Sequence, residues 1–472
     1  MPQSSHRYDY IVIGAGQAGP PLAARLVGAG RKVALIESRE LGGTCVNWGC
    51  TPTKTLRKSA RVAHLARRAS EFGVTVGEVR VDFAAAMARM QGRVEASRSG
   101  LQKWLDGLDG LHIVRARGRL AGREGDDYVV TAGHQRLTAP RVLLNTGTRP
   151  RMPDVPGLQG LPALDNESLL ALRELPEHLL VIGGGYIGLE MAQIFRRLGA
   201  RASIVDPGER LASHEDRDIS EAIASMMKGE GIELHLGQAI ASAGAAAGGV
   251  QLVLAGGEKL RGSHVLVATG RTANTDDLGL ESIEPGIELD RHGIVSTNAQ
   301  LETSAPGIWA LGDINGRGAF THTSYYDHDI VAENILAEPG PPPRSAEGRH
   351  AIYAMFTDPP LGHVGLYEAD ARKLVQRGRK ISQAVIAMDE VSRAKEEGET
   401  QGLMKLLIDE ESGEFLGATL LGIGADEIVQ VIGQAMAAGS DWRTVRNALP
   451  VHPTVTEFLP TMIDKRKPLS GD

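Results

Sequence analysis

The chain contains only two cysteines, Cys45 and Cys50, and both lie in the segment GGTCVNWGCTPTK, residues 42–54. At this spacing one helical turn or a tight loop could bring the two sulfur atoms within bonding distance. A metal site is one alternative, but two thiolates alone make a poor zinc site and no other Cys or His with ligand spacing lies nearby. A buried structural pair is another. Because the pair directly follows a dinucleotide-binding pattern, we interpret it as a redox-active pair.

Two segments share that pattern: a buried strand, a GxGxxG turn, a helical run and a second strand that ends at an acidic residue. In both copies the acidic residue lies 23 positions after the first glycine. The strands of the first copy are expected over 8–13 and 32–36. The glycines and acidic residues are Gly14, Gly16, Gly19 and Glu37 in the first copy and Gly183, Gly185, Gly188 and Asp206 in the second.

Each residue type in this pattern has a physical role. The first glycine permits the tight turn, the second lets the backbone approach a pyrophosphate, and the third lets the helix pack closely on the strand. The helix N-terminus then faces the phosphates, and the acidic residue accepts hydrogen bonds from the ribose hydroxyls. Because the pattern occurs twice, the sequence predicts two bound dinucleotides.

The acidic residue of the second copy bears on the choice of coenzyme. A carboxylate at Asp206 would bind the 2′-hydroxyl of NAD and repel the 2′-phosphate of NADP, whose sites place an Arg nearby. Arg210 is the only candidate close in sequence. We therefore expect NAD, with NADP as the alternative.

Composition excludes several other classes of protein. A length of 472 residues indicates about three domains, and a net charge of −7 argues against a nucleic-acid partner. The N-terminus has no export signal. The uncharged stretch 238–257 is mostly small residues, so we expect a hairpin there and not a membrane span. The sequence favours a cytoplasmic protein without a membrane segment.

The remaining segments show how the chain is organised. Short apolar runs end at glycines in 142–147, 265–270 and 307–313, as expected where a strand end meets a ligand. The proline-rich segment 338–348 indicates a linker. Beyond it we expect strands over 403–409 and 415–421 and a helix over 425–438.

The segment GGTCVNWGCTPTK resembles the active-site segment of the class I pyridine nucleotide-disulfide oxidoreductases, which include dihydrolipoamide dehydrogenase, glutathione reductase and mercuric reductase. The resemblance continues through GGGYIGLE, ATGRTAN, GIWALGD and VHPTVTE in the order found in that family, and it covers nearly the whole chain.

The resemblance implies a fold and a reaction. FAD would lie on the first unit and the nicotinamide on the second, with electrons passing from the nicotinamide through the flavin to a Cys45–Cys50 disulfide. Cys50 would be the flavin-proximal thiol and Cys45 the thiol that attacks the substrate disulfide. His452 and Glu457 would be an acid-base pair supplied by the partner subunit, so the enzyme would be a homodimer with a shared active site.

The resemblance also assigns cofactor contacts. Glu37 would bind the adenosine ribose of FAD and Asp313 its ribityl chain. Lys54 and Glu190 would form an ion pair beside the flavin, although alone they would be taken for surface charges. Tyr186 would cover the nicotinamide pocket, or else be a packed aromatic at a helix start. The other assigned contacts are Gly43, Thr44, Gly118, Thr146, Gly147, Gly270, Arg271, Gly312 and Thr321.

The predicted fold class is α/β, with two doubly wound, Rossmann-like nucleotide-binding domains and a C-terminal α+β dimerisation domain. The FAD domain would be discontinuous, over residues 1–150 and 275–345. The NAD(P) domain would span 151–274 and the dimerisation domain 346–472. No metal-ligating residues are predicted.

The substrate is less well defined. No cysteine occurs near the C-terminus, which argues against mercuric ion reduction and against relay to a C-terminal cysteine pair. Trp48 and the sequence before His452 differ from the lipoamide dehydrogenase pattern. We expect a small-molecule or lipoyl-type disulfide. The alternatives are an NADH oxidase or a metal-ion or quinone reductase, and a non-catalytic redox sensor.

Overall fold

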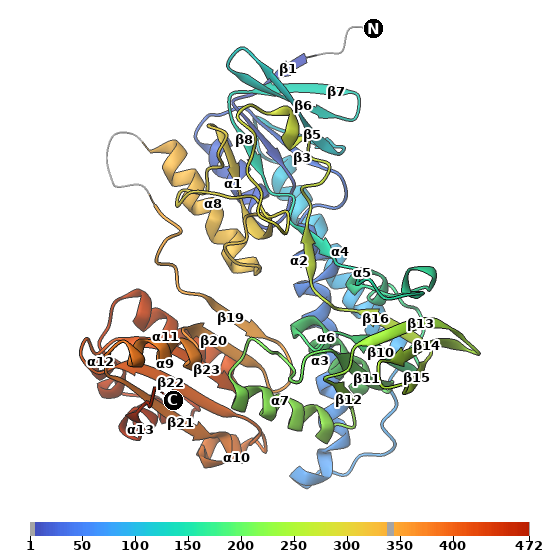
Figure 1. The fold of residues 1–472 in the computed structure, drawn as a ribbon, viewed down its shortest axis with the longest axis vertical. Coiled ribbons are helices and arrows are strands. Elements are labelled where there is room, and N and C mark those ends of the chain that lie inside the picture. Colours follow the sequence, from blue (N-terminus) through green and yellow to red (C-terminus); the bar gives the residue numbers. More distant parts are fainter. Residues whose placement is uncertain (1–4, 338–343, 472) are drawn as a thin grey trace.

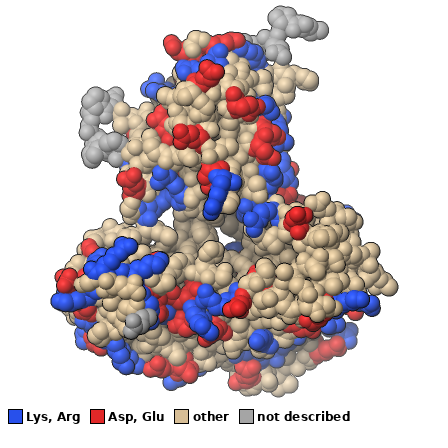
Figure 2. All heavy atoms as spheres, viewed as in Figure 1, with Lys and Arg blue, Asp and Glu red and all other residues tan. Residues whose placement is uncertain are grey.

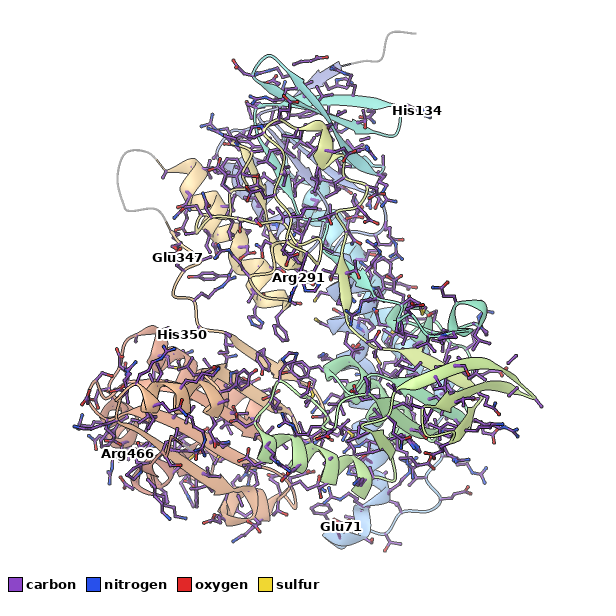
Figure 3. The ribbon with its side chains drawn as sticks, viewed as in Figure 1. Glu71, His134, Arg291, Glu347, His350 and Arg466 are labelled. Atoms are coloured by element: carbon purple, nitrogen blue, oxygen red, sulfur yellow. The ribbon has the colours of Figure 1, made fainter. Side chains whose placement is uncertain are left out.

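The structure, a computed structural model, describes residues 5–337 and 344–471. It has three units, as Figure 1 shows: a first α/β unit at the top, and a second α/β unit and a C-terminal α+β unit below it. Figure 3 places His350 on the segment that leads from the first unit to the C-terminal unit. Most of the predicted linker, residues 338–343, lies outside the described residues.

The first unit is built on a five-stranded parallel sheet with the order β18-β8-β2-β3-β4. Tyr10 and Val12 of β2 pack on the side of α1 and α8, whereas Ile11 and Ile13 pack on the side of a second, mixed sheet. This double burial explains why the strand is a continuous apolar run. The elements are β2 (Tyr10–Ile13), α1 (Gly19–Gly28), β3 (Val33–Glu37), β4 (Leu111–Arg115), β8 (Val142–Leu144), β18 (Ile308–Ala310) and α8 (Thr321–Leu336). The second sheet holds β1 (Ser5–Arg7), β5 (Gly118–Glu124), β6 (Asp127–Ala132) and β7 (Gln135–Ala139).

The second unit repeats this arrangement. Its four-stranded parallel sheet has the order β12-β11-β10-β16, with an antiparallel sheet β13-β14-β15 beside it. Strands β13 and β14 form the hairpin expected in the stretch 238–257. The elements are α5 (Asn166–Leu169), β10 (His178–Ile182), α6 (Tyr186–Leu198), β11 (Arg201–Asp206), α7 (Arg217–Gly229), β12 (Glu233–Leu236), β13 (Ile240–Ala246), β14 (Gly249–Leu254), β15 (Lys259–Gly262) and β16 (His264–Val267). Two short strands, β9 (Thr148–Pro150) and β17 (Arg271–Ala273), pair between the units.

The helices that follow the cysteines connect the first two units. Helix α2 (Gly43–Trp48) contains Cys45, and α3 (Cys50–Arg67) begins at Cys50. Together α3 and α4 (Phe83–Asp106) pack against α6, with Leu56, Phe83 and Phe195 in one buried cluster. The packing of α3 on the second unit therefore determines where Cys50 lies.

The C-terminal unit has a six-stranded antiparallel sheet in the order β19-β20-β23-β22-β21-β24. Strands β22 and β23 have the predicted bounds, and α11 ends one residue earlier than expected. The strands are β19 (Ile352–Met355), β20 (Leu361–Gly365), β21 (Ile381–Ala387), β22 (Leu403–Asp409), β23 (Phe415–Leu421) and β24 (Lys467–Pro468). The helices are α9 (Glu368–Gln376), α10 (Ser392–Glu396), α11 (Ala425–Ala437), α12 (Trp442–Asn447) and α13 (Leu459–Asp464).

A buried lysine holds the C-terminal unit against the second unit. Lys405 Nζ lies 2.9 Å from Asp216 Oδ2 and 2.6 Å from Glu368 Oε2, and the Lys405 side chain is 3% exposed. Asp216 directly precedes α7, and Lys405 and Glu368 belong to the C-terminal unit. A buried charge left without its partners is strongly destabilising, so this cluster fixes β22 and α9 relative to the start of α7.

The predicted α/β fold class is confirmed. The first unit differs from the simplest doubly wound sheet because a second, mixed sheet covers one of its faces. Among the described residues, the helices are all too short or too polar to cross a bilayer.

Candidate active site

A cavity of about 1980 Å³ lies where the three units meet. Figure 2 shows the hollow between the upper lobe and the two lower ones. The cavity reaches both glycine-rich turns and the cysteine pair. The predicted site residues that line it are Gly14, Gly16, Glu37, Gly43, Thr44, Cys45, Cys50, Lys54, Gly118, Thr146, Gly147, Gly183, Gly185, Tyr186, Glu190, Asp206, Gly270, Arg271, Asp313 and Thr321.

Five predicted residues do not line this cavity. Gly19 and Gly188 lie behind their turns, where an added Cβ would lie 2.3 Å from the Gly14 oxygen and 2.1 Å from the Gly183 oxygen respectively. Gly312 packs beside the side chain of Ser324. The last two, His452 and Glu457, belong to the C-terminal unit. The third glycine of each turn thus has a packing role.

The two glycine-rich turns have the same construction. Gly14 and Gly183 both have positive φ, +104° and +111°, and an added Cβ at either would lie within 2.5 Å of a neighbouring carbonyl oxygen. The Ala15 N–H donates to Glu37 Oε2 at 2.8 Å, and the Gly184 N–H donates to Asp206 Oδ2 at 2.6 Å. Each acidic residue therefore holds its own turn in place while its carboxylate borders the cavity.

Asn145 is a residue that the sequence analysis missed. Its buried side chain accepts from the Gly19 N–H at 3.0 Å and donates to the Leu311 oxygen at 3.0 Å. Asn145 thereby connects the start of α1 to the residue that follows β18. The only sequence signal was its place in the strand-end motif 142–147.

The two cysteines are free thiols that share a hydrogen bond. This hydrogen bond from Cys45 lowers the pKa of Cys50 to about 6, with further contributions from the Thr321 hydroxyl and the Lys54 charge. The same bond, together with burial, raises the pKa of Cys45. The proton of the dithiol therefore stays on Cys45 and the negative charge on Cys50.

Thr321 begins α8, and its Oγ1 lies 3.2 Å from Cys50 Sγ. Replacing Thr321 with valine removes this donor, so we expect the pKa of Cys50 to rise by about one unit. The thiolate of the wild-type dithiol is lost as the pH falls through about 6, and in the variant this loss occurs at higher pH. The measurement is the ultraviolet absorbance of the thiolate against pH.

Thr55→Val is the matched control, because the Thr55 hydroxyl donates to the Thr51 oxygen within α3 and not to sulfur. An unchanged midpoint in Thr321→Val would show that this contact does not stabilise the thiolate.

An ion pair joins all three units beside the cysteines. Lys54 Nζ lies 2.9 Å from Glu190 Oε2, and Glu190 Oε1 accepts from the Phe356 N–H at 2.8 Å. The Glu190 side chain is only 8% exposed. Lys54 and Glu190 are therefore not two solvated surface charges but a partly buried ion pair in the cavity wall.

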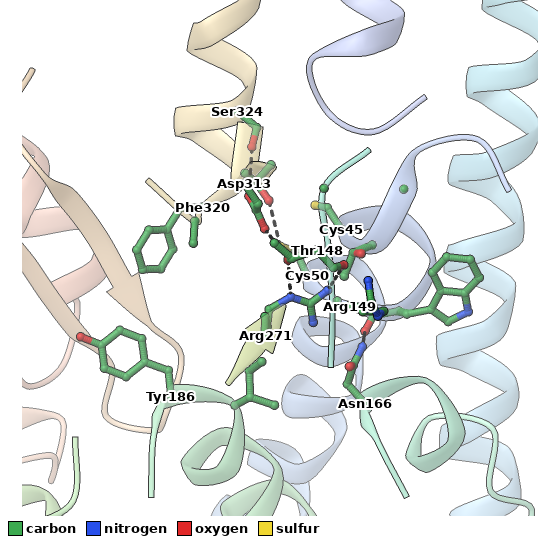
Figure 4. A pocket seen from close by; sticks show the side chains of 18 of the residues that line it. Cys45, Cys50, Thr148, Arg149, Asn166, Tyr186, Arg271, Asp313, Phe320 and Ser324 are labelled. Carbon is green, nitrogen blue, oxygen red and sulfur yellow. Dashed lines mark hydrogen bonds between the residues drawn. The ribbon is translucent and has the colours of Figure 1, made fainter. Parts of the chain in front are cut away.

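A second polar chain borders the same cavity (Figure 4). Arg271 Nε donates to Thr148 Oγ1 at 2.7 Å, and Asp313 accepts from Thr148 at 3.2 Å and from Ser324 at 3.3 Å. Burial raises the pKa of Asp313 and lowers that of Arg271. Thr148 and Ser324, which the sequence analysis missed, thus satisfy a buried carboxylate that borders the cavity.

Trp48, which differs from the lipoamide dehydrogenase pattern, is contacted by residues from two directions. The Arg39 guanidinium lies 3.8 Å from the centre of the indole ring and forms an ion pair with Glu167 at 2.6 Å. Asn166 Nδ2 donates to the Trp48 oxygen at 2.7 Å. Helix α2, which carries Cys45, is therefore connected at its last residue to the start of the second unit.

His452 and Glu457 pair with each other but not with the cysteines of their own chain. His452 Nδ1 lies 2.9 Å from Glu457 Oε2, and the His452 side chain is 78% exposed. Within residues 5–337 and 344–471 no group of three or more His, Cys, Asp or Glu side chains is placed to hold a metal ion.

Two family models match the chain. Residues 8–327 match the pyridine nucleotide-disulphide oxidoreductase model, and residues 352–463 match the model of the dimerisation domain of the same family.

Among curated proteins, the probable pyridine nucleotide-disulfide oxidoreductase RclA of Escherichia coli (strain K12) is 30% identical over 96% of this chain and 98% of that protein. Dihydrolipoyl dehydrogenase of Chlorobaculum tepidum is 32% identical, over 96% and 95% respectively. Mercuric reductase of Streptomyces lividans is 33% identical, over 93% and 92%. Among solved structures, a Cu(II) complex of the HOCl-induced flavoprotein disulfide reductase RclA from Escherichia coli has a TM-score of 0.87 at 29% identity and covers 97% of this chain and 99% of that one.

Proposed function

The chain belongs to the pyridine nucleotide-disulphide oxidoreductase family, and from this premise we propose that it is a homodimeric, FAD-dependent NADH:disulfide oxidoreductase. The observation that carries the proposal is the adjacent pair Cys45 and Cys50 in a cavity that both glycine-rich turns also reach. In this proposal residues 1–150 and 275–345 bind FAD, residues 151–274 bind NAD(P), and residues 346–472 form the dimer interface.

The residues present fit two dinucleotides. Helices α1 and α6 both begin beside the cavity and have no acidic residue in the first turn, so the positive N-terminal charge is free to attract phosphates. An added Cβ at Gly43 would lie 2.8 Å from the Gly16 Cα. A side chain at Gly43 would therefore clash with the first glycine-rich turn, where FAD would bind. FAD, when bound, would accept a hydride from the nicotinamide and supply two electrons to sulfur.

The cysteines would carry out the disulfide chemistry. The Cys45 thiolate attacks one sulfur of the substrate and forms a mixed disulfide, releasing the first thiol. Cys50 then attacks Cys45 Sγ, releases the second thiol and leaves a Cys45–Cys50 disulfide, which takes up two electrons to return to the dithiol. Since Cys45 holds the proton in the dithiol, its attack requires a base.

We propose that the partner subunit's His452 is this base. The pair with Glu457 orients the imidazole. Leu449 and Val451 beside it are 97% and 74% exposed, an apolar surface that a second copy of the chain would cover. The match to the dimerisation domain supports the same arrangement.

The predicted coenzyme is NADH. We expect kcat/KM for NADH to exceed that for NADPH by about tenfold or more, because the Asp206 carboxylate would repel a 2′-phosphate. Asp206→Asn keeps an acceptor for the Gly184 N–H but removes the charge, so the preference should shrink. Steady-state kinetics with both coenzymes check this, and a wild-type preference for NADPH would contradict it.

The proposed function is tested by counting thiols. Anaerobic NADH should convert the oxidised enzyme, with no titratable thiol, to one with two, and the chain has only these two cysteines. Lipoamide or glutathione disulfide should then restore the disulfide. Flavin reduction without the appearance of thiols would refute the disulfide reductase proposal.

Metal-ion reduction is a second candidate, favoured by the similarity to a structure described as a Cu(II) complex and to mercuric reductases. NADH-dependent reduction of Cu(II) that persists in Cys45→Ser would support metal-ion reduction. Rapid NADH-dependent oxygen consumption would instead support an NADH oxidase.

A further inference from the structure

Glu215 is a buried carboxylate that the proposed reaction does not use. It is 2% exposed, and no cation in the described part of the chain forms an ion pair with it. Burial raises the pKa of this carboxyl group. Among the residues that the structure describes, its Oε2 atom has no hydrogen-bond partner. Burying such a group is costly, so its presence requires a reason other than packing.

The other carboxylate oxygen of Glu215 accepts hydrogen bonds from tyrosine hydroxyls of two units. Tyr186, the first residue of α6, donates to Oε1. Tyr353, on β19 of the C-terminal unit, donates to the same atom at 2.6 Å. The hydroxyl groups of Tyr353 and Tyr367 are also in contact. Glu215 therefore links the start of α6 to the C-terminal unit.

The backbone around Glu215 strengthens this link. The Glu215 N–H donates to the Ala212 oxygen at 2.8 Å, and the Ala212 N–H donates to the Gly184 oxygen at 2.8 Å. Ala212 has a positive φ of 44°, which is unusual for a residue with a Cβ. The loop that carries Glu215 is thus fastened to the glycine-rich turn that Tyr186 follows.

The aromatic rings form the cavity wall in front of Glu215. Tyr186, Phe320 and Tyr353 all line the cavity, whereas Glu215 lies behind them. The Phe320 and Tyr353 rings are parallel, with centroids 5.0 Å apart, and Tyr186 lies 5.5 Å from Tyr353. In Figure 4 the Tyr186 side chain extends away from Cys45 and Cys50.

We propose that Glu215 is a positioning residue that holds the Tyr186 ring against the C-terminal unit and so keeps the nicotinamide pocket open. This inference rests on the proposed function only in taking the second turn as a nicotinamide site. Without the hydrogen bond the ring samples positions over the pocket. The apparent dissociation constant for the coenzyme then equals the intrinsic constant divided by the fraction of molecules whose pocket remains open.

The test is the dissociation constant of NAD⁺ for the FAD-loaded homodimer, measured by calorimetry. Glu215→Met removes the acceptor and Tyr186→Phe removes the donor, and each should raise the dissociation constant about tenfold. The double variant should be no weaker than either single variant, because both remove the same bond. Glu215→Gln keeps an acceptor oxygen and should stay within about threefold of the wild type.

Removing the ring itself separates positioning from a structural role. In Glu215→Met combined with Tyr186→Ala, affinity should return to that of Tyr186→Ala alone, since no ring is left to cover the pocket. Glu221→Met is the matched control, because Glu221 lies exposed on the adjacent helix and forms an ion pair with Arg217 of the same helix. At saturating NADH, kcat should be unchanged in Glu215→Met.

Several results would overturn the proposal: unchanged or tighter NAD⁺ binding in Glu215→Met and Tyr186→Phe, additive losses in the double variant, or no recovery when the ring is removed. If Glu215→Met fails to fold, Tyr186→Phe alone decides, because it removes one hydroxyl only. Failure of the wild type to bind NAD⁺ would refute both proposals. The expected binding pattern without NADH-dependent appearance of thiols would refute the disulfide reductase function alone.

Discussion

Cys45→Ser lowers the rate of disulfide reduction by about four orders of magnitude or more, because a serine hydroxyl cannot form the mixed disulfide. Flavin reduction by NADH should survive, since the residues assigned to the two dinucleotides are unchanged. The measurements are steady-state turnover with lipoamide or glutathione disulfide and the visible spectrum after anaerobic NADH.

The same variant separates the candidate functions. One titratable thiol should remain after NADH addition, which checks that the other cysteine is intact. Disulfide turnover at the wild-type rate would remove the cysteine pair from the electron path. Loss of disulfide reduction with retained Cu(II) or oxygen reduction would show that the reduced flavin serves these acceptors directly.

His452→Ala lowers kcat for disulfide reduction by about 10²–10⁴-fold, the usual effect of losing a general acid-base group. The physical reason is that Cys45, which holds the proton of the dithiol, then loses the base proposed to remove it. Since the His452 side chain is 78% exposed in the single chain, its removal should cost little stability there. His134→Ala is the control, because His134 lies at the tip of the first unit (Figure 3).

Mixed dimers test whether the site is shared. A heterodimer of one Cys45→Ser chain and one His452→Ala chain would have one site with both groups intact and should recover about half of the wild-type activity. The two chains carry different affinity tags so that the heterodimer can be purified. An inactive heterodimer would mean that each chain uses its own His452.

Local patterns in the sequence were enough for the parts that depend on backbone conformation. The turns at Gly14 and Gly183 need a positive φ that glycine adopts readily, and the hairpin within 238–257 follows from a stretch made mostly of small residues. The strand β22 was predicted to the residue because its apolar run is bounded by polar turns. The family motifs identified the cysteine pair and the fold class in the same way.

Other features depend on residues that meet only after folding. Asn145 contacts Gly19, and Thr148 contacts Asp313, across more than a hundred positions each. No local spacing encodes these contacts, because a polar side chain near a strand end is equally compatible with solvent.

The sequence by itself determined the two glycine-rich units, the position of the cysteine pair and the family, since these rest on glycines, cysteines and acidic residues at fixed short spacings. The tertiary structure decided which thiol keeps the proton and how Glu215 joins Tyr186 to the C-terminal unit. Both depend on burial and on distances between distant segments. A carboxylate or a thiol in a sequence has no environment until the units that surround it have packed together.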